Sequence, residues 1–330
     1  MDRPLVSIIT PAYNAGAYIT ETVASVLRQG YRPLEYIVVD DGSSDDTLAQ
    51  LRAFGDAIRV VVQKNAGEGA AVNRGYACAG GEILGVVNAD DPVLSGLIET
   101  AVDTLCGDPD LAGVYPDWLK IDSTGRVLEV MRLPDYDYSL MLRRHLCLIG
   151  PGGLFRRSAL GDEPPRDPRF RYSGDYHQWL RIGLQRPLRH IPTVSATWRF
   201  HPGGTSQALL NAELAADKVA IIRDLFARPD LPLSLVPLRD EAMSAAYFFA
   251  AILALHNPGI PARRYMWESL KAKPWWPGPV IAQRHRSLRL VLFALGMPWT
   301  RPLLSLYRGL RPERFAVPTP GDHYSAWSGP

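Results

Sequence analysis

The chain has 330 residues, of which 47% are hydrophobic and 21% charged, a composition that fits a folded globular protein and excludes a disordered or fibrous one. A formal net charge of +2 argues against a protein-wide field for nucleic acid, so no nucleic-acid partner is expected. The three cysteines, Cys78, Cys106 and Cys147, are widely spaced and odd in number, which predicts a reducing compartment without disulfides or a zinc motif.

Apolar, β-branched runs alternate with amphipathic segments in the first part of the chain. The expected strands are residues 5–10, 34–39, 58–62 and 83–87. Helices are expected at 17–28, after Asp45, and through Ala79. Strands and helices that alternate with short connections are typical of a parallel α/β sheet with right-handed crossovers. Further on, residues 118–121 and 127–130 predict a hairpin.

Polar residues follow three of these strands where each one ends. Tyr13 follows the first strand, Asp40 and Asp41 the second, and Asp90 and Asp91 the fourth. Ligands of an open parallel sheet gather at these ends, where an aromatic face suits a nucleobase and paired acids suit a divalent cation. Taken singly, each acid is equally compatible with a helix cap or turn, and the tyrosine with simple packing. Neither G-x-G-x-x-G nor a P-loop motif is present, which excludes those two nucleotide sites.

The order and spacing of several short motifs add a family resemblance. They are Val6-Ser7-Ile8-Ile9-Thr10-Pro11-Ala12-Tyr13-Asn14, Val38-Val39-Asp40-Asp41-Gly42-Ser43-Ser44-Asp45, Asn65-Ala66-Gly67, Asn73-Arg74-Gly75 and Asn88-Ala89-Asp90-Asp91. Over about the first two thirds of the chain this resembles the inverting family 2 glycosyltransferases. The resemblance implies the GT-A fold, a Rossmann-like mixed α/β sheet. It further implies nucleotide-sugar contacts at Pro11, Tyr13, Asp41, Asn73 and Asp90.

The same resemblance implies a metal site for Mg²⁺ or Mn²⁺. Asp90 and Asp91 match the family's DxD-like motif, and His201 stands in an Arg-x-His-Pro-Gly stretch whose histidine contacts metal or diphosphate in related enzymes. Without the resemblance, such a histidine is more often a surface turn residue. The family often has Asp where this chain has Asn88, so the motif carries one negative charge fewer than the commonest pattern.

Asp175 is the expected catalytic residue. It stands at the start of an expected helix that resembles the family's Glu-Asp helix, whose Asp is the general base, although Gly174 replaces the usual Glu. Inverting transfer needs one base for the acceptor hydroxyl and one cation for the departing diphosphate. Without the resemblance, a capping role for Asp175 would be the simpler interpretation.

The last third of the chain changes character. Residues 242–255 predict an apolar helix, and the segment beyond it, residues 257–315, mixes many Lys and Arg with Trp. Such a mixture suits an anionic membrane surface, whereas the alternative is a helical appendage that packs on the catalytic domain. The predicted domains are a catalytic domain at 1–206, a helical basic extension at 207–315 and a disordered tail, rich in Pro, Gly and Ser, at 316–330.

The sequence therefore predicts a metal-dependent, inverting, hexosyltransferase-type enzyme. Its expected donor is a nucleotide-sugar, with a UDP-sugar favoured, and its expected acceptor is a sugar or lipid-linked hydroxyl. Surface polysaccharide or glycolipid synthesis is the expected setting, in the cytoplasm or peripherally on the inner face of the cell membrane, since no signal peptide precedes the first strand. The alternatives are a nucleotidyltransferase and a non-catalytic nucleotide-binding partner, the latter raised by Asn88 and Gly174.

Overall fold

A computed structural model describes residues 3–161, 163–201, 203–204, 211–254, 261–274 and 323–326. The chain divides into two compact units. The first takes Met1–Tyr138, Cys147–Ala208 and Val317–Pro330, and the second takes Ser139–Leu146 and Leu209–Ala316. Compared with the predicted domains, a short segment before Cys147 joins the second unit, and the C-terminal end joins the first.

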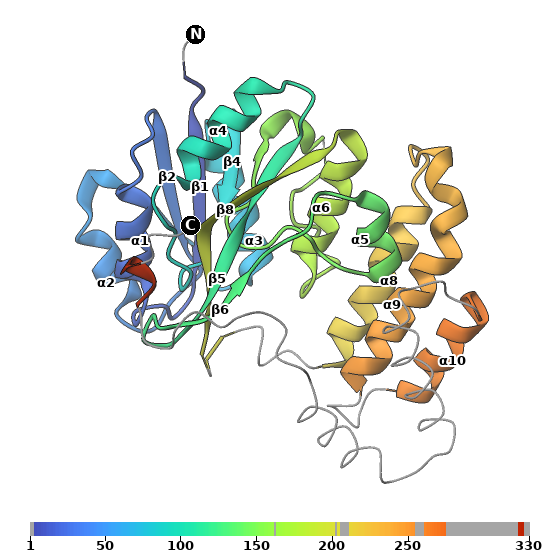
Figure 1. Cartoon of the computed structure of the whole chain (residues 1–330). Coiled ribbons are helices and arrows are strands. Elements are labelled where there is room, and N and C mark those ends of the chain that lie inside the picture. The colour runs from blue at the N-terminus through green and yellow to red at the C-terminus, as the bar shows by residue number, and fades with distance from the viewer. Residues whose placement is uncertain are drawn as a thin grey trace. The chain divides into compact units, whose positions relative to one another are not determined.

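The first unit is built on one mixed sheet (Figure 1). Its strands are β1 (Val6–Ala12), β2 (Leu34–Asp40), β3 (Arg59–Val62), β4 (Ile83–Val86), β5 (Gly113–Asp122), β6 (Val127–Met131), β7 (Leu154–Arg156) and β8 (Leu188–Phe200). The order is β3-β2-β1-β4-β7-β5-β6, with β8 paired to β5. Strands β1 to β4 are mutually parallel, and β7 runs antiparallel to both β4 and β5. The predicted α/β fold is confirmed, and β5 and β6 form the expected antiparallel hairpin.

Strand β1 lies between β2 and β4 in the sheet, and both of its faces are covered. All seven of its residues are buried, which explains why the run, apart from Ser7, is apolar or β-branched instead of alternating. The helices of this unit are α1 (Ile19–Leu27), α2 (Thr47–Arg52), α3 (Glu68–Cys78), α4 (Leu97–Gly107) and α6 (Gly174–Gln185), with short 3₁₀ turns η1 (Gly55–Ala57) and η2 (Arg157–Ala159). Side chains of α1, α2 and α4 share one core cluster with Val6, Ile8 and Val38.

Helix α3 covers the opposite face of the sheet. Ala71 of α3 packs with Ile37 and Val39 of β2. A Cβ added at Gly75 would overlap the side chain of Ile9, so the glycine lets α3 approach β1 closely. This contact gives a packing reason for the glycine of the Asn73-Arg74-Gly75 motif.

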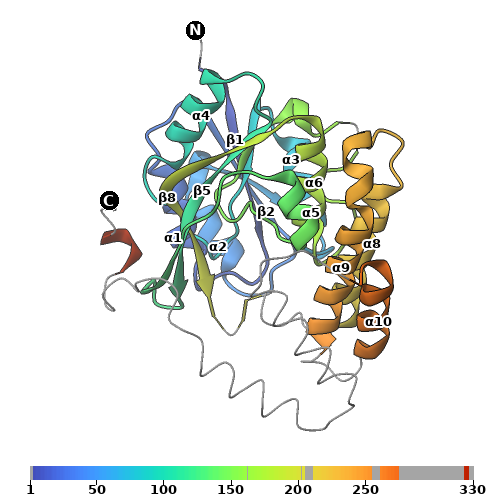
Figure 2. The ribbon, with the colours of Figure 1, turned by 45° about the vertical axis from the view of Figure 1, so that its right-hand side comes forward.

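The described part of the second unit is helical. It contains most of α5 (Tyr138–Arg144), together with α8 (Ala212–Phe226), η3 (Leu233–Leu238), α9 (Arg239–Ala254) and α10 (Ala262–Ala272). Helices α8, α9 and α10 lie side by side in both ribbon views (Figures 1 and 2). Glu241, buried in α9, accepts from Arg143 Nε at 2.8 Å and from Lys273 Nζ at 2.9 Å. Among the residues with defined positions, no helix is long and apolar enough to cross a bilayer.

The C-terminal end differs from its predicted disorder wherever it is described. Tyr324–Ala326 form a 3₁₀ turn, η4, and His323 makes a β-bridge with Arg126. The Tyr324 side chain is only 3% exposed, in a cluster with Leu119, Ile121, Val127 and Val194. The remainder of the predicted tail, and residues 275–315 of the predicted basic extension, lie outside the described residues.

Candidate active site

The candidate site lies where the parallel strands β2, β1 and β4 end. Because these strands are neighbours in the sheet, the segments that follow them meet at one edge, as predicted. Tyr13 follows β1 with 53% of its surface exposed, whereas Pro11 is buried within the strand, opposite Val39 of β2. An exposed aromatic ring at this edge offers a face on which a base can stack.

The loops after β1 and β2 are hydrogen-bonded to each other. Asn14, in a left-handed conformation with φ 49°, donates its backbone N–H to Ser43 Oγ at 3.0 Å and accepts from the Ser44 N–H at 2.8 Å through its side chain. The Gly16 N–H donates to Asp45 Oδ2 at 3.0 Å. These reciprocal bonds fix the edge of the sheet before any ligand arrives, which lowers the entropic cost of binding.

Two adjacent acids end β2, and their surroundings differ. Asp41 is 2% exposed, and its Oδ1 accepts from Gln63 Nε2 at 2.7 Å and the Ala66 N–H at 2.9 Å. Its Oδ2 accepts from the Gly67 N–H at 2.8 Å, so the carboxylate holds the loop that leads into α3. Asp40 is 1% exposed, and its Oδ1 has no hydrogen-bond donor among the described residues. The site residue chosen from the sequence, Asp41, is therefore engaged internally, while Asp40 keeps an unsatisfied acceptor.

Asp90 and His201 meet at the end of β4. His201 Nε2 lies 3.0 Å from Asp90 Oδ2, with 13% and 31% of the respective side chains exposed. The ring of Tyr18 contacts the His201 ring edge-on, with centroids 4.8 Å apart. Two of the three predicted metal ligands thus come together, although they are 111 residues apart in the chain.

Asp91 points into the protein instead. It is 3% exposed, and its Oδ1 accepts from the Arg199 backbone N–H at 2.7 Å while its Oδ2 accepts from Asn88 Nδ2 at 2.9 Å. Burial, and then the neighbouring charge of Asp90, raise the pKa of Asp91. Asn88 therefore has a physical reason for replacing Asp, because only the amide can donate a hydrogen bond here, and an aspartate would bring a third carboxylate against a buried one.

The acids of this corner do not by themselves make a metal coordination sphere. Among the described residues, no group of three or more His, Cys, Asp and Glu side chains is arranged to hold a metal ion. Asp90 and His201 supply one oxygen and one nitrogen ligand that solvent can reach. Two protein ligands fit a cation that is bound jointly by protein and a diphosphate, the usual situation for Mg²⁺ in nucleotide sites.

Asp175 is the second residue of α6. It is exposed, and its Oδ1 accepts from the N–H of the next residue, Tyr176, at 2.7 Å. Ser173 occupies the N-cap position and makes no side-chain capping bond. Trp179, on the following turn, packs edge-on against Phe155 of β7 with centroids 5.4 Å apart, which anchors the helix on the sheet. The carboxylate is thus presented to solvent from a rigid helix start, where negative charge is favoured.

Arg166 was not anticipated from the sequence. Its backbone is held by Asn73, whose amide donates to the Arg166 carbonyl at 2.7 Å and accepts from its N–H at 2.8 Å. Ideal Cβ atoms at Gly69 and Gly174 would lie 3.5 Å and 3.4 Å from the Arg166 side chain, so the start of α3 and the start of α6 both border it. The guanidinium is buried, with Glu68 Oε1 at 3.8 Å, and the charges of Glu68 and Asp175 act to raise its pKa. Asn73 was predicted to contact the nucleotide, but both the nitrogen and the oxygen of its side-chain amide are hydrogen-bonded to the backbone of Arg166.

Comparison with known proteins gives these features a family context. Residues 7–162 match the family model for glycosyl transferase family 2. An uncharacterized glycosyltransferase of Rickettsia prowazekii is 31% identical over 222 residues, which cover 63% of this chain and 68% of that protein. The chondroitin synthase of Escherichia coli is 30% identical over 209 residues, covering 62% of this chain and 30% of that protein.

Two solved structures are similar in fold. Staphylococcus aureus TarS (residues 1–349) in complex with UDP-GlcNAc has a TM-score of 0.57 at 16% identity, covering 80% of this chain and 88% of that one. The mannosyltransferase PcManGT of Pyrobaculum calidifontis, in complex with GDP-Man and Mn²⁺, has a TM-score of 0.54 at 19% identity, covering 89% and 86%. At these identities the likeness concerns the GT-A-type fold alone.

Proposed function

The chain belongs to glycosyl transferase family 2, and from that premise we propose that it transfers a sugar from a nucleotide-sugar donor to an acceptor hydroxyl, with inversion at the anomeric carbon and with help from a divalent cation. The pairing of Asp90 with His201 at the end of β4, beside the nucleotide-type edge of β1 and β2, carries this proposal. Family membership favours glycosyl transfer over nucleotidyl transfer, the alternative raised by the sequence.

The donor base is proposed to stack on Tyr13. The unsatisfied Oδ1 of Asp40 is suited to accept a hydrogen bond from a base N–H, and Asp41 shapes the same edge through its bonds to Ala66 and Gly67. A donor N–H next to a carbonyl is present in uracil and in guanine, so a UDP-sugar and a GDP-sugar both satisfy this chemistry. We favour a UDP-sugar, and the binding experiment below compares the two.

Asp90 and His201 would hold the cation. When bound, a divalent cation stabilises the negative charge that develops on the departing diphosphate. A mixed oxygen and imidazole donor set favours Mn²⁺ over Mg²⁺, which prefers oxygen ligands. Asp91 is proposed to support this site indirectly, since both of its oxygens already accept hydrogen bonds from Asn88 and Arg199.

Asp175 is proposed as the general base. Its carboxylate would take the proton of the acceptor hydroxyl while that oxygen forms a bond to the anomeric carbon and the bond from this carbon to the diphosphate oxygen breaks. The products are a glycoside and a nucleoside diphosphate, which needs no protonation by a second carboxylic acid. Arg166, bordering the start of α6, places a fixed positive charge in this region.

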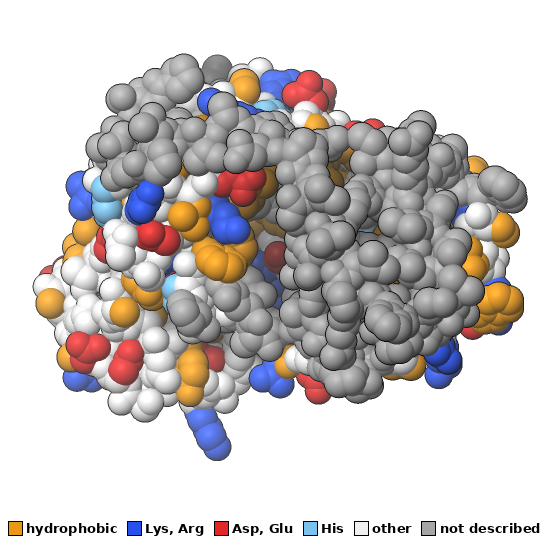
Figure 3. Space-filling view, turned by 60° about the horizontal axis from the view of Figure 1, so that its bottom comes forward, with side chains coloured by type: hydrophobic (Ala, Val, Ile, Leu, Met, Phe, Trp, Pro, Cys, Tyr) orange, Lys and Arg blue, Asp and Glu red, His pale blue; other side chains and the backbone are white. Residues whose placement is uncertain are grey.

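A membrane-proximal setting is proposed from α10. Its exposed side chains include Arg263, Arg264, Trp267 and Lys271, whereas Met266 and Ser269 are buried on the other side. Three of them recur at intervals of four residues, and Trp267 is 60% exposed, so cations and an aromatic ring share one stripe. On the face drawn in Figure 3, acidic and basic side chains of the described residues lie interspersed.

Vesicle binding tests this setting. Replacing Arg263 and Lys271 by Gln should weaken co-sedimentation with phosphatidylglycerol vesicles by about fivefold per charge, with Trp267→Ser adding to the loss. Arg52→Gln, at an exposed basic residue of α2, is the matched control and should bind as the unaltered protein does. Equal binding by all variants would leave α10 as a helix that only packs within its unit. Vesicle binding that depends on α10 would fit an acceptor embedded in a membrane, as in surface polysaccharide or glycolipid synthesis.

Donor binding tests the function itself. Thermal shift and calorimetry with UDP and GDP, each with Mn²⁺ or Mg²⁺, should show a nucleotide whose affinity rises with the cation. Turnover with matching nucleotide-sugars should then release a nucleoside diphosphate and no pyrophosphate. Metal-dependent binding without turnover on any donor would favour the non-catalytic alternative, and the absence of nucleotide binding would contradict the proposal.

A further inference from the structure

The C-terminal segment, residues 323–326, is built into the first unit. The Tyr324 N–H donates to the Gly125 carbonyl at 2.9 Å, and His323 forms a β-bridge with Arg126, so the segment pairs with the β5–β6 turn. A Cβ at Gly125 would overlap the His323 ring, and φ +86° at this position also favours glycine. The buried Tyr324 ring, in a cluster from β5, β6 and β8, shows that this contact is a packed one.

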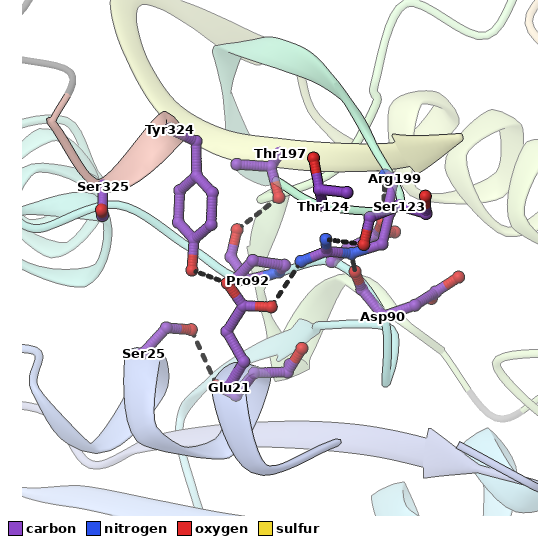
Figure 4. A network of polar contacts seen from close by, with 12 residues as sticks. Glu21, Ser25, Asp90, Pro92, Ser123, Thr124, Thr197, Arg199, Tyr324 and Ser325 are labelled. Atoms are coloured by element: carbon purple, nitrogen blue, oxygen red, sulfur yellow. Dashed lines mark hydrogen bonds and ion pairs between the residues drawn. The ribbon is translucent and has the colours of Figure 1, made fainter. Parts of the chain in front are cut away.

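The hydroxyl of Tyr324 reaches an ion pair between the part-exposed Glu21 and the buried Arg199. It donates to Glu21 Oε1 at 2.7 Å, and Glu21 Oε2 accepts from Arg199 Nη2 at 2.6 Å (Figure 4). Burial, and then its bond to the Glu21 carboxylate, raise the pKa of Tyr324, which keeps the phenol protonated as a donor. Glu21 thus links the C-terminal segment to a guanidinium that is only 1% exposed.

Arg199 in turn holds the acids at the end of β4. Its Nε donates to the Asp90 carbonyl at 2.9 Å, and its backbone N–H donates to Asp91 Oδ1 at 2.7 Å. Its guanidinium lies 4.7 Å from the centroid of the Tyr18 ring, and that ring contacts His201. One side chain therefore contacts the backbone of Asp90 and the aromatic ring that packs on His201, as Figure 4 shows for Asp90.

From this chain of contacts we infer that Tyr324 is a positioning residue for the metal-dependent donor site, so that the C-terminal segment is needed for tight binding of the metal–nucleotide complex. The inference rests on the proposed function, in which Asp90 and His201 are the ligands. Without the phenol, Glu21 loses its neutral donor, so its part-exposed carboxylate can shift and draw the Arg199 Nη2 with it. A small shift of Arg199 moves Asp90, because the two are joined through a backbone carbonyl.

Tyr324→Phe tests the inference with minimal disturbance of packing. Affinity for Mn²⁺–UDP and Mn²⁺–GDP, measured by calorimetry on the full chain, should fall by about three- to tenfold, less than the full value of one hydrogen bond to a charged group because Tyr324 acts on the site through Glu21 and Arg199. Tyr31→Phe is the matched control, since the fully buried Tyr31 donates one hydrogen bond, to the Pro4 carbonyl at 2.6 Å, outside this network. Both variants should lose similar thermal stability, and only Tyr324→Phe should lose affinity.

Deletion of residues 317–330 gives a second, independent measurement. The truncated chain should bind Mn²⁺–nucleotide more weakly, and a synthetic peptide of residues 317–330 added in excess should restore binding, whereas the same peptide with Phe at 324 should restore less. Unchanged affinity in Tyr324→Phe, with Asp90→Ala impaired, would overturn the inference and leave the proposed function intact. Unchanged affinity in Asp90→Ala would instead contradict the proposed function.

Discussion

Paired acids lie at the ends of two strands, β2 and β4, and the two pairs have a similar arrangement of hydrogen bonds. In each pair the second acid is enclosed by protein donors, Asp41 by the loop before α3 and Asp91 by Asn88 and Arg199. The first acid keeps an oxygen that no described main-chain or amide group satisfies: a buried one on Asp40, and one beside His201 on the part-exposed Asp90. Under the proposed function, the two adjacent acids have different roles: the enclosed one organises the loop, and the other would contact the ligand.

Asp175 belongs to neither pair, and its substitution should lower turnover more than any other change considered below. Asp175→Asn keeps the size of the side chain but cannot accept the proton of the acceptor, so turnover should fall by about 10²- to 10⁴-fold. Donor affinity should stay unchanged, because the pairs at β2 and β4 are untouched. Transfer kinetics and calorimetry on the same preparation check this expectation, and turnover within about threefold of the unaltered enzyme would remove Asp175 from the base role.

Asp91→Asn should act on stability before it acts on binding. An amide keeps one acceptor but places an NH₂ group against either the Asn88 amide or the Arg199 N–H, so a buried hydrogen bond is lost. We expect a loss of about 1–3 kcal/mol in the free energy of unfolding, measured with denaturant. The double change Asn88→Asp with Asp91→Asn reverses donor and acceptor and should recover part of that loss. An unaltered free energy of unfolding in Asp91→Asn would mean that Asp91 is not enclosed as described.

The β2 pair offers the same contrast on a smaller scale. Asp40→Asn should weaken nucleotide binding by about tenfold, the cost of one hydrogen bond to a charged acceptor, and leave folding intact. Asp41→Asn should lower the melting temperature, because its oxygens accept from the N–H groups of Ala66 and Gly67. Calorimetry and thermal melts on both variants separate the two roles. The opposite pattern, with affinity lost only in Asp41→Asn, would assign the hydrogen bond to the nucleobase to Asp41.

The strands of the parallel half were predictable because each contains a largely apolar run, which in β1, β2 and β4 reflects burial, and each run falls within one or two residues of β1 to β4. The edge of the sheet that carries the candidate site was predictable too, because polar residues come directly after these apolar runs. Which acid of a pair is enclosed by protein donors was not predictable, since neighbouring residues at a strand end have no fixed side once the ladder stops. Arg166 and Tyr324 depend on contacts 93 and 303 residues apart in the chain. For Tyr324 one signal existed, a large aromatic residue in a tail otherwise rich in Pro, Gly and Ser.

Calorimetry of Mn²⁺–nucleotide binding to Asp90→Ala tests most directly whether Asp90 binds the cation while Asp91 only holds the loop after β4. Asp90 is partly exposed and its carboxylate is proposed to bind the cation, so its loss should reduce affinity by about 10- to 100-fold while the free energy of unfolding stays within error. The metal-free nucleotide should bind the variant as it binds the unaltered protein. Full Mn²⁺-dependent affinity in Asp90→Ala would contradict the account.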